Sequence, residues 1–321
     1  MAILYHCAPS ALAQLRFTPT PELTCLQILA NYPVPFAIIL NMAEGFKLYH
    51  YNPSAGAAVA FAAVFGLTTV IHIWQLGRSR AWYFIPFLIG CFFETFGYLA
   101  RYASAEETPN WTTKPYIAQS LMLLLAPAFF AASIYMILGR IIRLLNGASC
   151  SMVRPSWLTK IFVTGDVLSF LIQSGGGGML ATAKTASKID LGNNMIVVGL
   201  FVQIIFFGFF ILVSLVFHRR MLKTPLHAVG DTRLPWARYM KLLYLASALV
   251  MIRSIYRVAE YLQGSDGYLQ SKEAFVYVFD AALMFICCLL FNIFHPSGII
   301  SGYRKAQEEP DLEMLNNSGY K

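Results

Sequence analysis

The stretch Arg253-Ser-Ile-Tyr-Arg257-Val-Ala-Glu260-Tyr-Leu-Gln-Gly264 places two arginines and a glutamate at the end of an apolar segment that begins near Tyr239. An ionisable side chain at the depth of a lipid bilayer costs several kcal/mol unless it is paired or faces water inside a helical bundle. The spacings of four and three residues put all three charges on one face of a helix. Because two stacked arginines repel each other, we expect neighbouring helices to supply carboxylates to them.

The composition is that of an integral membrane protein. Of the 321 residues, 57% are hydrophobic and only 12% are charged, whereas a soluble globular domain contains about 25% charged residues. The formal net charge of +8 does not indicate a nucleic-acid partner, because the basic residues fall in short loops between apolar runs. The six cysteines have no zinc-ligand spacing, and we predict neither a bound metal nor another cofactor.

Seven apolar stretches predict an all-α integral membrane fold, a seven-transmembrane helical bundle. Each stretch is about 20 residues long, which is enough to cross a hydrocarbon core of ~30 Å. The predicted spans are 53–75, 83–102, 116–138, 158–179, 194–217, 239–261 and 273–295. We expect a tail at 1–52, a transmembrane domain at 53–297 and a disordered tail at 298–321. Whether the proline-interrupted segment 23–42 forms an extra span is left open.

The distribution of basic residues orients the predicted bundle. Lysines and arginines gather in the first, third and fifth loops and after the last span, which places the N-terminus outside and the C-terminus in the cytoplasm. Asn110-Trp-Thr112 is a glycosylation sequon in the second loop, which this topology also places outside. Cys7 and Cys25 lie in the first tail and could form a disulfide there or remain free thiols.

Polar side chains inside the predicted spans form the candidate site. At a rise of ~1.5 Å per residue, Glu94, Arg253 and Asp280 come to a similar depth in the outer half of the membrane. We predict a network in which the arginines pair with Glu94, Asp280 and Glu260. The full set is Glu94, Arg101, Gln119, Asp166, Gln173, Gln203, Arg253, Arg257, Glu260 and Asp280. It either binds the head of an amphiphilic molecule or forms an ion-pair lattice that fixes the helix register.

Two other features have competing interpretations. The run Gln173-Ser-Gly-Gly-Gly-Gly178 lacks the lysine of a phosphate-binding loop, so close helix approach or a hinge is the expected use of its glycines. His72, His218 and His295 fall near the inner ends of their spans. They could hold a catalytic zinc or be interfacial polar residues, and no HxxxH or HExxH pattern supports the zinc.

Short motifs are spread over every predicted span from Tyr51 to Pro296. They include Tyr51-Asn-Pro-Ser54, Gly90-Cys-Phe-Phe-Glu94-Thr-Phe-Gly97-Tyr-Leu-Ala-Arg101, Pro115-Tyr-Ile-Ala-Gln119, Phe162-Val-Thr-Gly-Asp166, Gln173-Ser-Gly-Gly-Gly, Gly199-Leu-Phe-Val-Gln203, Arg253-Ser-Ile-Tyr-Arg257-Val-Ala-Glu260-Tyr and Tyr277-Val-Phe-Asp280-Ala. This pattern resembles the fungal RTA-like family of lipid-translocating exporters, named for resistance to aminocholesterol. The polar positions of the candidate site are also polar positions of the family pattern.

The resemblance implies a fungal multi-pass protein of the plasma membrane or a related membrane. It also implies a non-enzymatic translocator or exporter of amphiphilic lipids, such as sphingoid long-chain bases, or of lipophilic toxins, with porphyrin handling in some branches. Membrane lipids or amphiphilic small molecules are then the expected partners.

Two other classes of function remain open. One is a seven-span receptor-like signalling protein with cytoplasmic partners at the basic loop 218–238. The other is a lipid-modifying membrane enzyme that uses Asp166 or the inner histidines.

Overall fold

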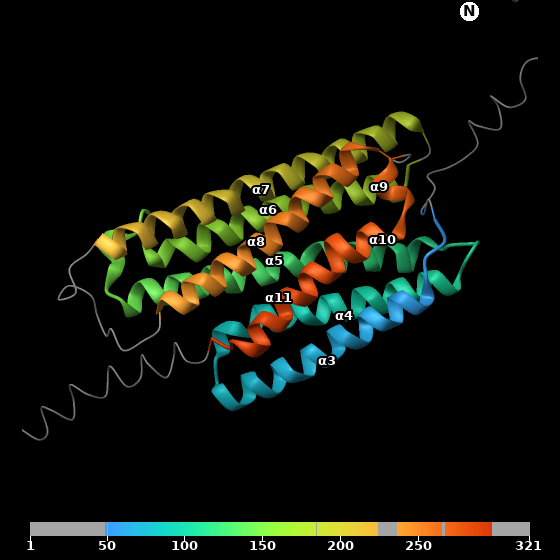
Figure 1. The fold of residues 1–321 in the computed structure, drawn as a ribbon. Coiled ribbons are helices and arrows are strands. Elements are labelled where there is room, and N and C mark those ends of the chain that lie inside the picture. The colour runs from blue at the N-terminus through green and yellow to red at the C-terminus, as the bar shows by residue number, and fades with distance from the viewer. Residues whose placement is uncertain (1–48, 50, 184, 224–235, 265–266, 297–321) are drawn as a thin grey trace, which may run out of the picture. The chain divides into compact units, whose positions relative to one another are not determined.

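The computed structural model describes residue 49 and residues 51–183, 185–223, 236–264 and 267–296 (Figure 1). Every regular element in these ranges is helical, which confirms the predicted all-α class. The long helices are α3 (Ala55–Ser79), α4 (Ile85–Glu106), α5 (Thr113–Leu144), α6 (Pro155–Ala181), α7 (Ala186–Lys223) and α8 (Trp236–Leu262). Two 3₁₀ turns, η2 (Trp82–Phe84) and η3 (Gly147–Cys150), join neighbouring helices.

The last part of the bundle is assembled from shorter pieces. They are α9 (Tyr268–Ser271), α10 (Glu273–Val276), η5 (Tyr277–Ala281) and α11 (Ala282–Ile293). The element η5 is a π-helical turn, so its wider backbone interrupts the α-helical repeat between α10 and α11. Single π turns of this kind occur often at functional positions of helices.

Six helical stretches are long and apolar enough to cross a membrane, which supports a multi-pass membrane protein. They are Ala55–Ser79, Trp82–Glu106, Lys114–Leu144, Ser187–Lys223, Trp236–Leu262 and Glu273–Ile293. The helix α6 is 27 residues long but is not among the six. The predicted seventh span at 158–179, and the orientation of the termini, therefore stay predictions.

Several predicted features fall outside the described residues. Among them are the possible Cys7–Cys25 disulfide, the segment 23–42 and the tail 298–321. The loop 218–238 is described only in part. Asn110 is described and exposed, so its side chain is accessible, and its glycosylation remains a prediction.

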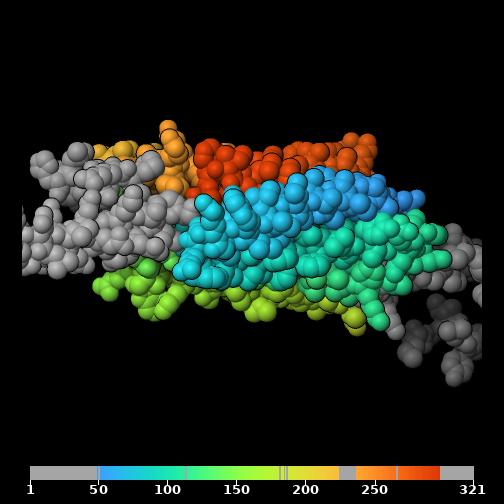
Figure 2. All heavy atoms as spheres, turned by 90° about the horizontal axis from the view of Figure 1, so that it is seen from below, coloured from blue at the N-terminus to red at the C-terminus, as the bar shows by residue number. Residues whose placement is uncertain are grey.

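The helix α5 occupies the centre of the described bundle. It packs against α4, α6 and α8, while α3 packs on α4, and α7 lies between α6 and α8. The chain returns through α11, which contacts both α3 and α8. The space-filling view shows α3 lying between the last helix on one side and α4 on the other (Figure 2).

The outward faces of the helices are apolar. On α3, Leu67, Val70 and Trp74 are each more than 60% exposed, and large apolar side chains on the other long helices are exposed in the same way. Soluble monomers rarely present such continuous apolar surface. Lipid tails are the environment in which these faces need no other cover.

Glycines bring α6 and α7 into close contact. A methyl group added at Gly176 would lie 2.7 Å from the carbonyl oxygen of Gly192 and 2.8 Å from a side-chain carbon of Ile196. Gly177 and Gly178 have no neighbouring atom within 4 Å of such a group. The predicted close approach of helices is therefore confirmed, and within the glycine run it depends mainly on Gly176.

We expect Gly176→Ala to lower the free energy of unfolding by about 1–3 kcal/mol, because the added methyl group overpacks the contact between α6 and α7. Gly177→Ala, at the next position, is the matched control and should be neutral or stabilising by about 0.5–1 kcal/mol. Thermal unfolding of the detergent-purified variants measures both effects. Equal stability of the two variants would contradict the assigned helix contact.

Candidate functional site

Two arginines of α8, the buried Arg253 and the partly buried Arg257, converge on one carboxylate. Arg253 and Arg257 both donate to Asp280, one to each carboxylate oxygen, and form ion pairs with it. Arg257 also pairs with Glu260, with 3.0 Å between Nη1 and Oε2. Arg253 is 1% exposed and Asp280 is 2% exposed. The predicted pairing of the arginines with Asp280 and Glu260 is present in the structure, and we call these four residues the central ionic cluster.

A proline in α5 explains the second contact of Arg253. In a regular α-helix the carbonyl of residue 123 would accept a hydrogen bond from the N–H of residue 127. Pro127 lies inside α5 and has no N–H to donate. The freed carbonyl oxygen of Leu123 instead accepts a hydrogen bond from Arg253 Nη2 at 2.7 Å. The carbonyl oxygen freed by the proline thus gains a donor, and the buried guanidinium gains an acceptor.

The position of Asp280 depends on a second backbone irregularity. Asp280 is one of the two buried residues of the π-helical turn η5. This turn packs against α8, where both arginines lie. The central ionic cluster is therefore held between a proline-interrupted helix, a regular helix and a π turn.

Glu94 differs from the prediction, because it has no ion pair with an arginine of the described ranges. Its side chain is 1% exposed, and its Oε1 atom has no hydrogen-bond partner in the described structure. It nevertheless lies within electrostatic range of Asp280, Arg253 and Arg257. The depth estimate along the helices placed Glu94 beside the cluster correctly. The depth estimate could not show that both arginines already form ion pairs with Asp280.

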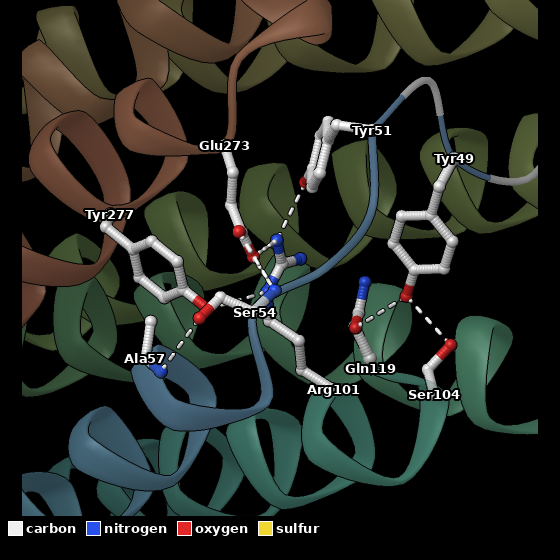
Figure 3. A network of polar contacts seen from close by, with 9 residues as sticks. All are labelled: Tyr49, Tyr51, Ser54, Ala57, Arg101, Ser104, Gln119, Glu273 and Tyr277. Atoms are coloured by element: carbon white, nitrogen blue, oxygen red, sulfur yellow. Dashed lines mark hydrogen bonds and ion pairs between the residues drawn. The ribbon is translucent and has the colours of Figure 1, made fainter. Parts of the chain in front are cut away.

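A second polar cluster surrounds Arg101 (Figure 3). Arg101 Nη2 donates to the Tyr51 hydroxyl at 2.7 Å and to Glu273 at 2.8 Å, and its Nε donates to the Tyr277 hydroxyl at 3.1 Å. Glu273 also accepts from the backbone N–H of Ser54 at 2.9 Å, and Ser54 caps the start of α3. This cluster ties the segment before α3 to α4 and to the last helix.

Gln119 belongs to the same end of the bundle. The Tyr49 hydroxyl lies 3.0 Å from both Gln119 Oε1 and Ser104 Oγ (Figure 3). Burial raises the pKa of Tyr49 above its ordinary value, which keeps the hydroxyl protonated and able to donate. Sequence reasoning missed Tyr49, Tyr51 and Glu273, although Tyr51 and the sequence after it were noted as a motif.

The remaining predicted polar residues lie in a third region, on α6 and α7. Asp166 accepts a hydrogen bond from the Tyr135 hydroxyl at 2.9 Å. Gln173 donates to Ser169 at 2.6 Å and to Gln203 at 3.3 Å, so it links the two helices. The ten predicted residues therefore fall into three groups. The structure brings four of them, with Glu94 nearby, into one ionic cluster.

The three histidines are not gathered at one point. His72 lies 3.3 Å from the carbonyl oxygen of Cys288, whereas His218 contacts Tyr244 at 3.0 Å and lies against Trp236. Within the described ranges, no group of three or more histidine, cysteine or acidic side chains could hold a metal ion. The arrangement of His218 argues against the zinc interpretation.

These features define the class of the protein as a helical, multi-pass membrane protein with buried ionic groups in its interior. The family model described as RTA1 like protein matches residues 87–303. The chain belongs to this family, which confirms the resemblance found in the sequence.

The chain is 37% identical to protoporphyrin uptake protein 1 of Saccharomyces cerevisiae, over 78% of this chain and 92% of that protein. It is 35% identical to protein RTA1 of the same species, over 79% of this chain and 86% of that protein. A more distant relative, the sphingoid long-chain base transporter RSB1 of Saccharomyces cerevisiae, is 23% identical over 78% of this chain and 73% of its own length. No solved structure matches the chain.

The contact between Arg253 and the proline-freed carbonyl can be tested with a double-mutant cycle. Arg253→Met should cost about 3–5 kcal/mol, because it breaks a buried pair and leaves the Leu123 carbonyl without its donor. Pro127→Ala restores an N–H for that carbonyl, so Arg253→Met should cost less in this background, with a coupling of about 0.5–3 kcal/mol. Chemical unfolding of the purified variants measures the cycle.

Pro115→Ala is the matched control for this cycle, because Pro115 lies in the first turn of the same helix, where the N–H that alanine restores has no helical acceptor. It should show no coupling to Arg253→Met. Coupling of equal size for the two prolines would contradict the assignment.

Proposed function

We propose that this protein translocates amphiphilic lipids or lipophilic toxins across a fungal membrane and does so without enzymatic chemistry. The observation that carries the proposal is a buried ionic cluster with an unpartnered carboxyl beside it, in a bundle whose outer faces are apolar. An amphiphile needs both environments, a polar group for its head and apolar surface for its tail. The name of one relative, a sphingoid long-chain base transporter, supports the same class of substrate.

The proposed substrate head binds between the central ionic cluster and Glu94. A sphingoid base carries an ammonium group and hydroxyls on a single apolar chain. Asp280 is already engaged by two arginines, so in the described structure Glu94 is the carboxyl beside the central ionic cluster with an oxygen available to accept an ammonium. The buried hydroxyls of Tyr98 and Tyr256 also have no hydrogen-bond partner in the described structure, and they are suitable partners for substrate hydroxyls.

An ion-pair lattice that only fixes helix register is the alternative to a binding site. Such a lattice needs its members to satisfy one another, because an unpaired buried polar group costs stability. The central ionic cluster meets this condition, because its two positive and two negative charges are paired with one another. Glu94 does not, and a buried ionisable group inside a membrane bundle is by default a functional candidate. The unsatisfied groups therefore favour binding over scaffolding alone.

A porphyrin is the second candidate substrate, because the name of one relative specifies protoporphyrin uptake. A porphyrin presents carboxylates instead of an ammonium, and it needs a cationic donor. Arg257 Nε is buried and has no hydrogen-bond partner among the described residues. The two substrates thus differ in the residue they would require, Glu94 for a base and Arg257 for an acid.

The proposed topology has seven spans, an outside N-terminus, a cytoplasmic C-terminus and a plasma-membrane location. We assign α6 as the seventh span because it packs along both α5 and α7, which are themselves apolar enough to cross the membrane. Its lower hydropathy reflects Asp166, Gln173 and the glycine run. Asp166 and Gln173 are buried against neighbouring helices.

We expect sphinganine to raise the unfolding temperature of the purified protein, since a ligand that binds the folded state stabilises it. Glu94→Gln should bind at least tenfold more weakly, because the amide cannot pair with an ammonium, while its stability without ligand stays unchanged. Thermal unfolding against a series of sphinganine, sterol amine, lysolipid and protoporphyrin concentrations measures the effect.

Glu106→Gln is the matched control, since Glu106 lies on the same helix but is exposed. It should keep the wild-type response to sphinganine. A protoporphyrin response that survives Glu94→Gln and is lost in Arg257→Gln would favour the second candidate. No response to any ligand would overturn the proposed function.

The outside location of the link between α4 and α5 has its own test. Wild-type protein made in yeast should carry an N-linked glycan, and Asn110→Gln should abolish it, because Asn110 is exposed in a sequon. Glycosidase treatment followed by gel mobility detects the difference. Asn316-Asn-Ser318 is a second sequon, and because it lies in the proposed cytoplasmic tail, Asn316→Gln should change nothing. A glycan that depends on Asn316 would reverse the topology.

A further inference from the structure

The buried charges near Glu94 balance without it. Arg253 and Arg257 contribute two positive charges, and Asp280 and Glu260 contribute two negative charges, all within ion pairs. An ionised Glu94 would add one uncompensated negative charge at a side chain that is only 1% exposed. The desolvation of such a charge is far more costly than that of a neutral carboxyl group.

Among the described residues around Glu94, none donates a hydrogen bond to its Oε1 atom. On its own helix, Tyr98 lies one turn away, and its hydroxyl has no hydrogen-bond partner in the described structure. Cys287 and Cys288 of α11 lie within electrostatic range of Glu94. From α8 and η5, the groups within electrostatic range are Arg253, Arg257 and Asp280. Both arginines already bond to Asp280.

We infer that Glu94 carries a proton when the site is empty, and that a cationic amphiphile displaces this proton on binding. The inference rests on the proposed function and names the chemistry of that site. The exchange is balanced: the ammonium keeps its charge, the Glu94 carboxyl becomes a carboxylate paired with it, and one proton leaves to water. The net charge of the buried region is zero before and after binding, so neither state contains an uncompensated ion.

This exchange supplies an energy source for transport. A carrier in which one proton and one ammonium compete for the same carboxyl moves them in opposite directions. Proton entry down its gradient then drives export of the cation. Because protons compete with the ligand, the affinity for an amine should fall as pH falls, by up to about tenfold for each pH unit. A ligand without a positive charge gains nothing from the exchange.

The test measures protons released when sphinganine binds to the full-length protein in detergent, with a pH indicator and minimal buffer. We expect about one proton released for each sphinganine bound to wild type, as linkage requires when one site changes its protonation. N-Acetylsphinganine, which has the same tail but no charge, should release none. Glu94→Gln should release none with either ligand, and Glu106→Gln should behave as wild type.

A second measurement does not depend on any ligand. The infrared difference spectrum of wild type minus Glu94→Gln should contain the carbonyl band of a protonated carboxyl group in the empty protein, and sphinganine should abolish this band. Sphinganine binding without proton release, or an empty-state spectrum of ionised carboxylate, would overturn the inference and leave the proposed function intact. Failure of wild type to bind any amphiphile would overturn both.

Discussion

The burial of Arg253 is the constraint on which the rest of the bundle depends. A guanidinium stays charged at every accessible pH, so the surrounding helices must provide an anion and further acceptors wherever it is buried. Asp280 supplies the anion and the Leu123 carbonyl supplies a neutral acceptor. These two contacts fix α8 against α5 on one side and against the last helix on the other. Loss of Asp280 would leave both arginines without their shared anion, and loss of Arg253 would leave the Leu123 carbonyl without its donor.

Two features that weaken an isolated helix become useful in this setting. Pro127 removes a hydrogen bond from α5, and the π turn η5 widens the last helix. Each lies where the central ionic cluster meets the backbone, because Arg253 bonds to the carbonyl that Pro127 frees, and Asp280 lies within η5. Irregular backbone inside a membrane is tolerated where protein groups satisfy it. The cluster meets that requirement at Leu123.

In the same way, protein groups compensate the buried Arg101 near the C-terminal end of α4. Its partners, Tyr51, Glu273 and Tyr277, come from segments far apart in the sequence. They join the chain before α3 to the beginning of the last helix. Glu94 stands apart from both clusters, since neither needs it to balance charge. A group that exchanges a ligand or a proton needs a carboxyl of this kind, which has no structural partner among the described residues.

The sequence alone determined the helical membrane class, the family and the need of the arginines for acidic partners. These properties follow from local composition, motif and spacing. Spacing along a helix gives depth but not the direction in which a side chain faces its neighbours. Only the tertiary structure could therefore decide that Asp280, rather than Glu94, pairs with both arginines, that Glu273 serves Arg101, and that a proline frees a carbonyl for Arg253. Each of these contacts joins residues that are distant in sequence, and helix packing alone brings them together.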